Sequence, residues 1–184
     1  MNGKEAAVLG IGVSNRPLIG LLCKAGACVT ACDKKTREQL GDTARQLEEM
    51  GVRLQLGEGY LENLTQEVIF RSPGIRPDLP SLEQAKAQGS RLTSEMEAFF
   101  EVCPCPILAV TGSDGKTTTT TLIAEMLKAE GKRVWLGGNI GQPLLSMAGE
   151  MKAEDFAVVE LSSFQLMTMS KAPHVAVVTN VTPN

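Results

Sequence analysis

The sequence predicts an α/β protein in which two successive runs of βα units form parallel sheets with covered faces. Short apolar stretches alternate with amphipathic stretches along the first 90 or so residues, and the alternation starts again after residue 106. A glycine follows most of the amphipathic stretches, as is typical where a helix ends before a buried strand. Together these two observations favour a two-domain α/β chain.

The first run spans the N-terminal half of the chain. Its expected strands cover residues 6–9, 28–32, 52–56 and 68–70. Its expected helices cover residues 17–25, 37–50, 80–88 and 95–100. We place the domain boundary near residue 94, which gives domains 1–94 and 95–184.

The second run begins after Cys103-Pro104-Cys105-Pro106, where two close prolines break regular structure. Its expected strands, all apolar enough to be buried, cover residues 107–110, 134–136, 156–159 and 175–178, and its first helix covers 116–130. Five threonines open that helix although threonine is a weak helix former, which indicates a role other than helix propensity. We expect the second sheet to be partial, with an exposed strand edge.

Composition excludes several functional classes. Apolar residues make up 43% and charged residues 21%, as in ordinary globular proteins, and the net charge of -3 gives no electrostatic case for a nucleic-acid partner. No apolar run approaches the roughly 20 residues that cross a bilayer, and the polar N-terminus lacks a signal-peptide core. We therefore expect a cytoplasmic protein without membrane insertion; no protein partner can be inferred. The five cysteines lack zinc-ligand spacing and are not expected to form disulfides.

A glycine-rich loop between an expected strand and an expected helix, residues 111–117, reads T-G-S-D-G-K-T. Unpaired N–H groups and the positive end of the dipole at a helix N-terminus attract phosphate. Lys116 would bring a charge to the β- and γ-phosphates, and Thr117 would offer a hydroxyl to Mg²⁺. Because Val110 stands where the common phosphate-loop pattern has a glycine, the segment predicts a variant of that loop.

Polar residues follow the neighbouring expected strands. Glu160 ends strand 156–159 and, like the acids of other phosphate-loop proteins, is a candidate for binding Mg²⁺ with Thr117, although a solvated strand-end acid is the alternative. Asn139 lies in a glycine-rich turn that is either ordinary or substrate-binding. Ser162 and Gln165 follow Glu160 at the carboxyl edge of the sheet, where open α/β folds bind ligands.

The first expected strand is followed by Gly10-Ile11-Gly12-Val13-Ser14-Asn15, an imperfect dinucleotide fingerprint in which Asn15 replaces the last glycine. Asp33 stands where that fingerprint has its ribose-binding acid. We expect a nucleotide-like ligand here rather than NAD, with residues 71–74 closing the same site. Lys34 and Lys35 either face solvent or supply charge to a diphosphate.

These motifs together resemble the Mur ligase family. The family patterns T-G-[ST]-[ND]-G-K-[ST]-T, G-G-N-I-G, E-L-S-S-F-Q-L and N-V-x-x-[DN] are matched by residues 111–118, 137–141, 160–166 and 180–184. The third pattern is that of the members that add D-glutamate to UDP-N-acetylmuramoyl-L-alanine. The resemblance implies a Rossmann-like N-terminal domain that binds the UDP sugar, followed by a partial P-loop α/β central domain that binds ATP.

The resemblance also implies roles for individual residues. ATP would contact Gly112, Ser113, Asp114, Gly115, Lys116, Thr117 and Thr118, with Mg²⁺ on Thr117 and Glu160 and with Lys116 and Glu160 catalytic. The UDP substrate would contact Val13, Ser14, Asp33, Lys34, Lys35, Ser72, Asn139, Ser162 and Gln165. The family activates the substrate carboxylate as an acyl phosphate, which the amine of D-glutamate attacks. Since the family continues past the equivalent of Asn184 with further metal-binding residues and a third domain, we expect the 184 residues to be inactive alone.

Two other functional classes stay open. One is a noncatalytic nucleotide-binding or regulatory module, and the other is a dinucleotide-dependent oxidoreductase. The Lys-Thr pair after Gly115 disfavours the oxidoreductase, because dinucleotide-binding folds do not need it. Dependence of nucleotide binding on Mg²⁺ would discriminate among the three.

Overall fold

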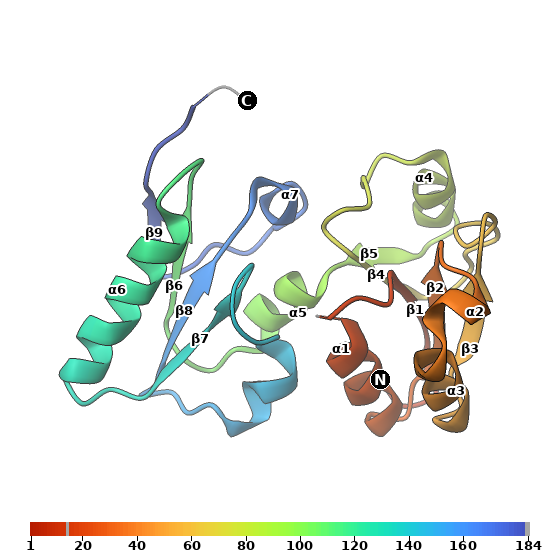
Figure 1. Ribbon diagram of the computed structural model, residues 1–184, viewed down its shortest axis with the longest axis horizontal. Coiled ribbons are helices and arrows are strands. Elements are labelled where there is room, and N and C mark those ends of the chain that lie inside the picture. The colour runs from red at the N-terminus through yellow and green to blue at the C-terminus, as the bar shows by residue number, and fades with distance from the viewer. Residues whose placement is uncertain (14, 183–184) are drawn as a thin grey trace. The chain divides into compact units, whose positions relative to one another are not determined.

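The computed structural model describes residues 1–13 and 15–182 of the chain. The chain divides into two compact units, Met1–Glu95 (unit 1) and Met96–Asn184 (unit 2). Each unit is built on its own sheet, and every strand pairing within both sheets is parallel (Figure 1). The α/β class predicted from the sequence is confirmed.

The sheet of unit 1 has the strand order β3-β2-β1-β4-β5. Its strands are β1 (Glu5–Leu9), β2 (Cys28–Asp33), β3 (Arg53–Leu56), β4 (Val68–Arg71) and β5 (Arg91–Thr93). The chain winds outward from β1 to β3 and then returns to place β4 on the other side of β1. The connections after β1 and β4 therefore leave in opposite directions, which creates the switch point where such sheets bind ligands.

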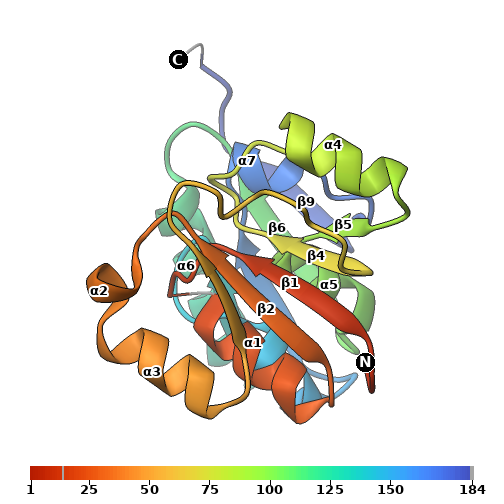
Figure 2. The same ribbon diagram turned by 90° about the vertical axis from the view of Figure 1, so that its right-hand side faces the viewer.

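The helices of unit 1 are α1 (Asn15–Lys24), α2 (Arg37–Leu40), α3 (Asp42–Glu49) and α4 (Pro80–Ala87). Helices α1 and α4 cover opposite faces of the sheet (Figure 2). On the α4 side the sheet and helix enclose an apolar cluster of Ala7, Leu9, Cys32, Leu64, Ile69, Leu82 and Ala85. Burial in this cluster raises the pKa of the Cys32 thiol to about 12.

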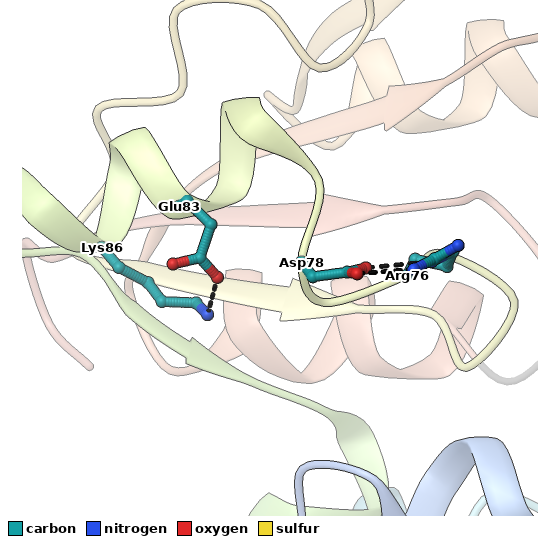
Figure 3. A network of polar contacts seen from close by, with 4 residues as sticks. All are labelled: Arg76, Asp78, Glu83 and Lys86. Atoms are coloured by element: carbon teal, nitrogen blue, oxygen red, sulfur yellow. Dashed lines mark hydrogen bonds and ion pairs between the residues drawn. The ribbon is translucent and has the colours of Figure 1, made fainter.

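Exposed ion pairs accompany α4 rather than hold it in place. Figure 3 shows Arg76 paired with Asp78 ahead of the helix and Lys86 paired with Glu83 within it, each with a nitrogen–oxygen distance of 2.6 Å. Exposed pairs of this kind contribute little to stability. The apolar cluster beneath α4 is therefore what fixes the helix on the sheet.

The single helix expected over residues 37–50 is wrong, because it is divided into α2 and α3. Gly41, between them, has φ 54° and ψ -129°, a conformation that glycine adopts at little cost. Helix α2 is capped at its start by Thr36, whose side chain accepts a hydrogen bond from the backbone N–H of Gln39. The three-residue strand β5 was not predicted from the sequence at all.

The sheet of unit 2 has the strand order β7-β8-β6-β9. Its strands are β6 (Ile107–Thr111), β7 (Val134–Gly138), β8 (Phe156–Glu160) and β9 (Val175–Val178). The helices are α5 (Glu95–Val102), α6 (Lys116–Ala129), the 3-10 helix η1 (Leu145–Glu150) and α7 (Ser163–Leu166). Helix α6 packs across β6, β7 and β8 (Figure 1). Because these strands are parallel, their carboxyl ends all lie at the same edge of the sheet.

A polar contact ties β7 to the turn before β8. Trp135 Nε1 donates a hydrogen bond of 2.9 Å to Asp155 Oδ2, and the guanidinium of Arg133 lies over the indole ring. The hydrogen bond from Trp135 is the main reason why the pKa of Asp155 is lowered, with the backbone N–H of Lys152 and the charge of Arg133 contributing further. Asp155 is only 3% exposed, so this contact belongs to the folded core.

Strand β9 differs from its prediction as a buried strand. Among the described strands it pairs only with β6, and Val175 and Val178 are 48% and 57% exposed. The expectation of an exposed sheet edge in unit 2 is thereby confirmed. No helix within the described ranges combines the length and the apolar character needed to cross a membrane.

Candidate functional site

The phosphate loop connects β6 to α6. Helix α6 begins at Lys116, so its first backbone N–H groups point toward the loop without intrahelical partners. Lys116 Nζ donates hydrogen bonds to the carbonyl oxygens of Gly112 (2.7 Å) and Ser113 (2.8 Å). The ammonium group is therefore held over the loop, at the positive end of the helix dipole, where a phosphate group would be bound.

Gly112 is required by the close packing of this loop. Its φ is +138°, and an added Cβ atom would lie 2.1 Å from Thr179 Oγ1 and 2.9 Å from the carbonyl oxygen of Asn180. No side chain fits such a space. The loop is thus pressed directly against the end of β9.

Thr179 and Asn180, which we call the β9 clamp, directly follow β9 and form hydrogen bonds with the phosphate loop. The Asn180 side chain accepts a hydrogen bond from the backbone N–H of Asp114 (2.9 Å) and donates one to its carbonyl oxygen (3.2 Å). Thr179 Oγ1 lies 2.6 Å from that same carbonyl oxygen. The backbone N–H of Ser113 donates to the Asn180 carbonyl oxygen at 3.0 Å.

Sequence reasoning missed the β9 clamp, although Asn180 opens one of the quoted motifs. The available signal was a Thr-Asn pair directly after an apolar strand. Its use required the knowledge that β9 lies beside β6, and strand order is a property of the fold. Because the clamp consists of hydrogen bonds among uncharged amide, hydroxyl and backbone groups, no charge pattern reveals it either.

Glu160 lies next to the first turn of α6. Its carboxylate accepts hydrogen bonds from Thr117 Oγ1 (2.7 Å, to Oε2) and from Asn139 Nδ2 (2.9 Å, to Oε1). The backbone of Asn139 also donates to the Glu160 carbonyl oxygen at 2.8 Å. With an exposure of 1%, Glu160 is not the solvated strand-end acid of the alternative interpretation. Three of the residues named from the sequence therefore form one hydrogen-bonded group.

Thr117 and Glu160 are the candidate ligands for a magnesium ion. Their oxygen atoms lie side by side at the phosphate loop, and hydroxyl and carboxylate oxygens are the ligands that Mg²⁺ prefers. No cluster of three or more His, Cys, Asp or Glu side chains with metal-binding geometry occurs in the part of the chain that the structure describes. The donor set thus suits Mg²⁺, which commonly takes one or two protein ligands and completes its shell with phosphate oxygens and water.

Ser162 and Gln165 form the capping box of α7. The backbone N–H of Ser162 donates to Gln165 Oε1 at 2.9 Å, and Ser162 Oγ accepts from the backbone N–H of Gln165 at 3.3 Å. Gln165 is 8% exposed. These hydrogen bonds therefore fix the side-chain conformations of Ser162 and Gln165, which closely follow Glu160 in the chain.

A cavity of about 540 Å³ lies between the phosphate loop, the Asn139 turn, α7 and the end of β9. Predicted site residues in its wall are Gly112, Ser113, Lys116, Asn139 and Ser162. The remaining wall consists of the apolar side chains of Phe164, Leu166, Val178 and Val181 and of the polar residues Thr111, Ser163, Asn180 and Thr182. Thr118 is exposed on α6 and does not line this cavity. The cavity thus joins the phosphate loop to the residues proposed for a second substrate.

In unit 1 the predicted residues lie at the carboxyl ends of the strands. Asp33 ends β2 and is buried, and its carboxylate accepts hydrogen bonds from the backbone N–H groups of Ile11 (2.6 Å) and Lys35 (2.9 Å). The side chains of Lys34 and Lys35 are exposed, and Val13 is 85% exposed. Ser14 lies outside the described residues. Asp33 therefore joins the loop after β1 to the loop after β2.

Ser72 and Asn15 close the switch point between β1 and β4. Ser72 Oγ donates to the carbonyl oxygen of Leu9 at 2.7 Å. Asn15 Nδ2 lies 2.8 Å from the carbonyl oxygen of Gly10 and 2.9 Å from Ser72 Oγ. The asparagine that replaces the last glycine of the dinucleotide fingerprint thus fastens the loop, and the loop differs from a standard dinucleotide-binding turn.

Together these features define a phosphate-loop α/β protein with a second, Rossmann-like unit. A family model described as "Mur ligase MurD-like, N-terminal domain" matches residues 4–94, and one described as "Mur ligase middle domain" matches residues 110–184. These two matches account for most of the chain, which therefore belongs to the Mur ligase family.

Curated relatives agree with this assignment. The chain is 57% identical over 185 residues to "UDP-N-acetylmuramoylalanine--D-glutamate ligase" of Acetivibrio thermocellus, and 57% identical over 182 residues to the protein of that name in Clostridium botulinum strain Hall. The match covers 100% and 98% of this chain. The chain spans about 40% of the length of each relative.

Solved structures show the same fold. A ligase of Neisseria meningitidis that acts on UDP-N-acetylmuramate and a tripeptide has a TM-score of 0.54 at 19% identity, covering 99% of this chain and 62% of its own. The UDP-N-acetylmuramate-alanine ligase of Thermotoga maritima has a TM-score of 0.53 at 20% identity, covering 98% and 42%. At these identities the likeness concerns the fold alone.

Proposed function

We propose that the chain carries the UDP-sugar-binding and ATP-binding parts of a ligase that joins D-glutamate to UDP-N-acetylmuramoyl-L-alanine in peptidoglycan precursor synthesis. The observation that carries the proposal is the hydrogen-bonded group of Thr117, Glu160 and Asn139 beside Lys116, in a chain 57% identical to proteins with that name. The proposal places the reaction in the cytoplasm, where ATP is available.

ATP would bind with its phosphates at the N-terminus of α6. Backbone N–H groups at the start of the helix would contact phosphate oxygens, as would Lys116 Nζ, which would leave at least one of its present carbonyl partners. Residues Gly112 to Thr118 would surround the phosphates. Thr117 and Glu160 would hold Mg²⁺, which when bound neutralises charge on the phosphoryl oxygens.

The nucleotide part of the UDP sugar would bind to unit 1. The exposed Lys34 and Lys35 follow β2 and suit the diphosphate, while Val13, Ser14, Asp33 and Ser72 would surround the nucleoside. In unit 2, Asn139, Ser162 and Gln165 would hold the sugar–peptide part beside the phosphate loop. Binding of the sugar–peptide part in unit 2 would bring the carboxylate of its L-alanine to the γ-phosphate of ATP.

The chemistry that these residues support is phosphoryl transfer to a carboxylate, followed by attack of the D-glutamate amine. The chain's contribution would be positional and electrostatic. Lys116 would stabilise the charge on the transferring phosphoryl group, and Glu160 would keep the metal at the first turn of α6. Asn139 would connect the metal-binding carboxylate to the substrate-binding cavity, because it binds Glu160 and also lines the cavity.

Calorimetric titration of the 184-residue chain with ATP, with and without Mg²⁺, tests the nucleotide part of this proposal. The proposal predicts saturable ATP binding that requires Mg²⁺ and that leaves the binding of the UDP sugar intact. A noncatalytic nucleotide-binding module would bind nucleotide without a UDP-sugar site. Absence of ATP binding in both conditions would contradict the proposed nucleotide site.

A further inference from the structure

The phosphate loop uses its backbone N–H groups in two different ways. Those of Ser113 and Asp114 donate to Asn180, one to its carbonyl oxygen (3.0 Å) and one to its side chain (2.9 Å). The N–H groups of Lys116, Thr117 and Thr118 have no partner within the helix by the geometry of helix termini, and the first helical hydrogen bond is that of the Thr119 N–H to the Gly115 carbonyl oxygen. The backbone N–H groups in the front half of the loop therefore bind the residues after β9, and those at the start of α6 are available to bind phosphate.

Asn180 is unusual in that its amide group satisfies both backbone groups of a single residue. Its oxygen accepts from the Asp114 N–H and its nitrogen donates to the Asp114 carbonyl oxygen, so the side chain imitates a neighbouring strand. Thr179 Oγ1 adds a contact of 2.6 Å to the same carbonyl oxygen and one of 3.2 Å to that of Thr111. Rotation of the two peptide groups that flank the Asp114 Cα atom is thereby opposed.

We infer that Asn180, assisted by Thr179, is a positioning residue for phosphate binding: its side chain fixes the backbone on both sides of Asp114 and so aims the helix-terminal N–H groups and Lys116 at the nucleotide. This inference rests on the proposed function, because it names a further residue of that same site. The hydrogen bonds between the end of the edge strand β9 and the phosphate loop stabilise the conformation of both segments. Asn180 acts through the loop, so it is not a catalytic residue.

The exposure of the β9 clamp makes the inference testable without loss of the fold. Asn180 is exposed and Thr179 half-buried, so their removal leaves the sheet and the apolar core in place. The exposed Gln142 supplies an amide-to-alanine control in the same unit: unlike Asn180 it lies outside the cavity wall, and its side chain makes no hydrogen bond to any described residue. Thr179→Val and Thr179→Ser form a second pair, in which only serine keeps the hydroxyl.

The experiment measures the Kd of Mg²⁺-ATP and of inorganic triphosphate with Mg²⁺ by calorimetry, with urea unfolding as a check on the fold. Asn180→Ala is expected to raise both Kd values about tenfold, because it removes two hydrogen bonds that order the phosphate loop. Thr179→Val should raise them about threefold, whereas Thr179→Ser and Gln142→Ala should match the unchanged chain. The Kd of the UDP sugar should not change, which a general loss of structure would not explain.

Two results would overturn the inference, and they differ from failure of the proposed function. Folded Asn180→Ala protein that binds both phosphate ligands within about twofold of the unchanged chain would show that the β9 clamp does not position the loop. Relaxation of the Asp114 amide, measured by NMR without nucleotide, should show increased motion in Asn180→Ala, and unchanged motion would also refute the inference. Failure of the unchanged chain to bind Mg²⁺-ATP would instead refute the proposed nucleotide site, and the positioning role would fall with it.

Discussion

Replacement of Lys116 by methionine should weaken binding of Mg²⁺-ATP by between about 5-fold and about 70-fold. A unit charge about 4 Å from a phosphate charge gains about 4 kcal/mol near a protein surface. Lys116 Nζ already donates to two carbonyl oxygens, at 2.7 and 2.8 Å, and each such bond is worth about 1.5 kcal/mol when half exposed. Giving up one bond leaves a net gain of about 2.5 kcal/mol, and giving up both leaves about 1 kcal/mol.

Calorimetry on Lys116→Met and on the control Lys128→Met measures this difference. Lys128 lies near the other end of the same helix and makes an exposed ion pair with Glu125, so its replacement should change neither the Kd nor, beyond about 0.5 kcal/mol, the free energy of unfolding. A Kd for Lys116→Met within about twofold of the unchanged chain would refute the electrostatic role of Lys116. Equal loss in both variants would show that only net charge matters.

Three further predictions concern stability and reactivity. Gly112→Ala should lower the free energy of unfolding in urea by about 2 kcal/mol or more, because its Cβ has no room and its φ is +138°, whereas Gly149→Ala, which meets open space, should change it by less than about 0.5 kcal/mol. The lowered pKa of Asp155 means that the folded chain binds its proton less readily than the unfolded chain. The stabilisation by the Asp155 carboxylate should therefore be complete at pH 7 and be lost as pH falls below about 4. Between pH 7 and pH 3, the free energy of unfolding in urea should therefore fall less in Asp155→Asn than in the unchanged chain. Iodoacetamide at pH 8 should alkylate the exposed Cys28 well before Cys32, whose thiol has a pKa raised to about 12, and equal rates would contradict the burial of Cys32.

Many of the helices and strands could be predicted because apolar runs and glycines indicate where local structure begins and ends. Strands β1, β2, β6 and β8 and helices α1 and α6 begin and end within two residues of their predicted bounds. Strand β5 was missed because three residues carry too little periodicity to be recognised. Helices α2 and α3 were merged because the amphipathic pattern continues across Gly41, whose backbone conformation depends on the packing around it.

The environment of each element was harder to predict than its type. Strand β9 is as apolar as the central strands, yet it lies at an edge of the sheet, since strand order is set by tertiary contacts. The threonines that open α6 illustrate the reverse case. Thr117 Oγ1 donates to Glu160, and the fully buried Thr120 donates to the carbonyl oxygen of Lys116 at 2.7 Å. The weak helix propensity of the five threonines indicated another role, and the structure shows the side-chain contacts of two of them, Thr117 and Thr120.

For the candidate site in unit 2, the sequence indicated candidate residues but not the hydrogen bonds among them. Lys116, Thr117 and Glu160 were named from motif spacing, and the structure adds that Asn139 binds Glu160 and that Ser162 binds Gln165. Side-chain pairs of this kind join segments that only the folded chain brings together. The roles of these residues toward ligands remain predictions.

Calorimetric titration of the chain with UDP-N-acetylmuramoyl-L-alanine, with UDP-N-acetylmuramate and NADH as matched controls, tests the central claim most directly. We predict saturable binding of UDP-N-acetylmuramoyl-L-alanine, weaker binding of the sugar nucleotide without alanine, and no binding of NADH. Saturable binding of NADH with no binding of either UDP sugar would contradict the ligase assignment and favour a dinucleotide-dependent enzyme.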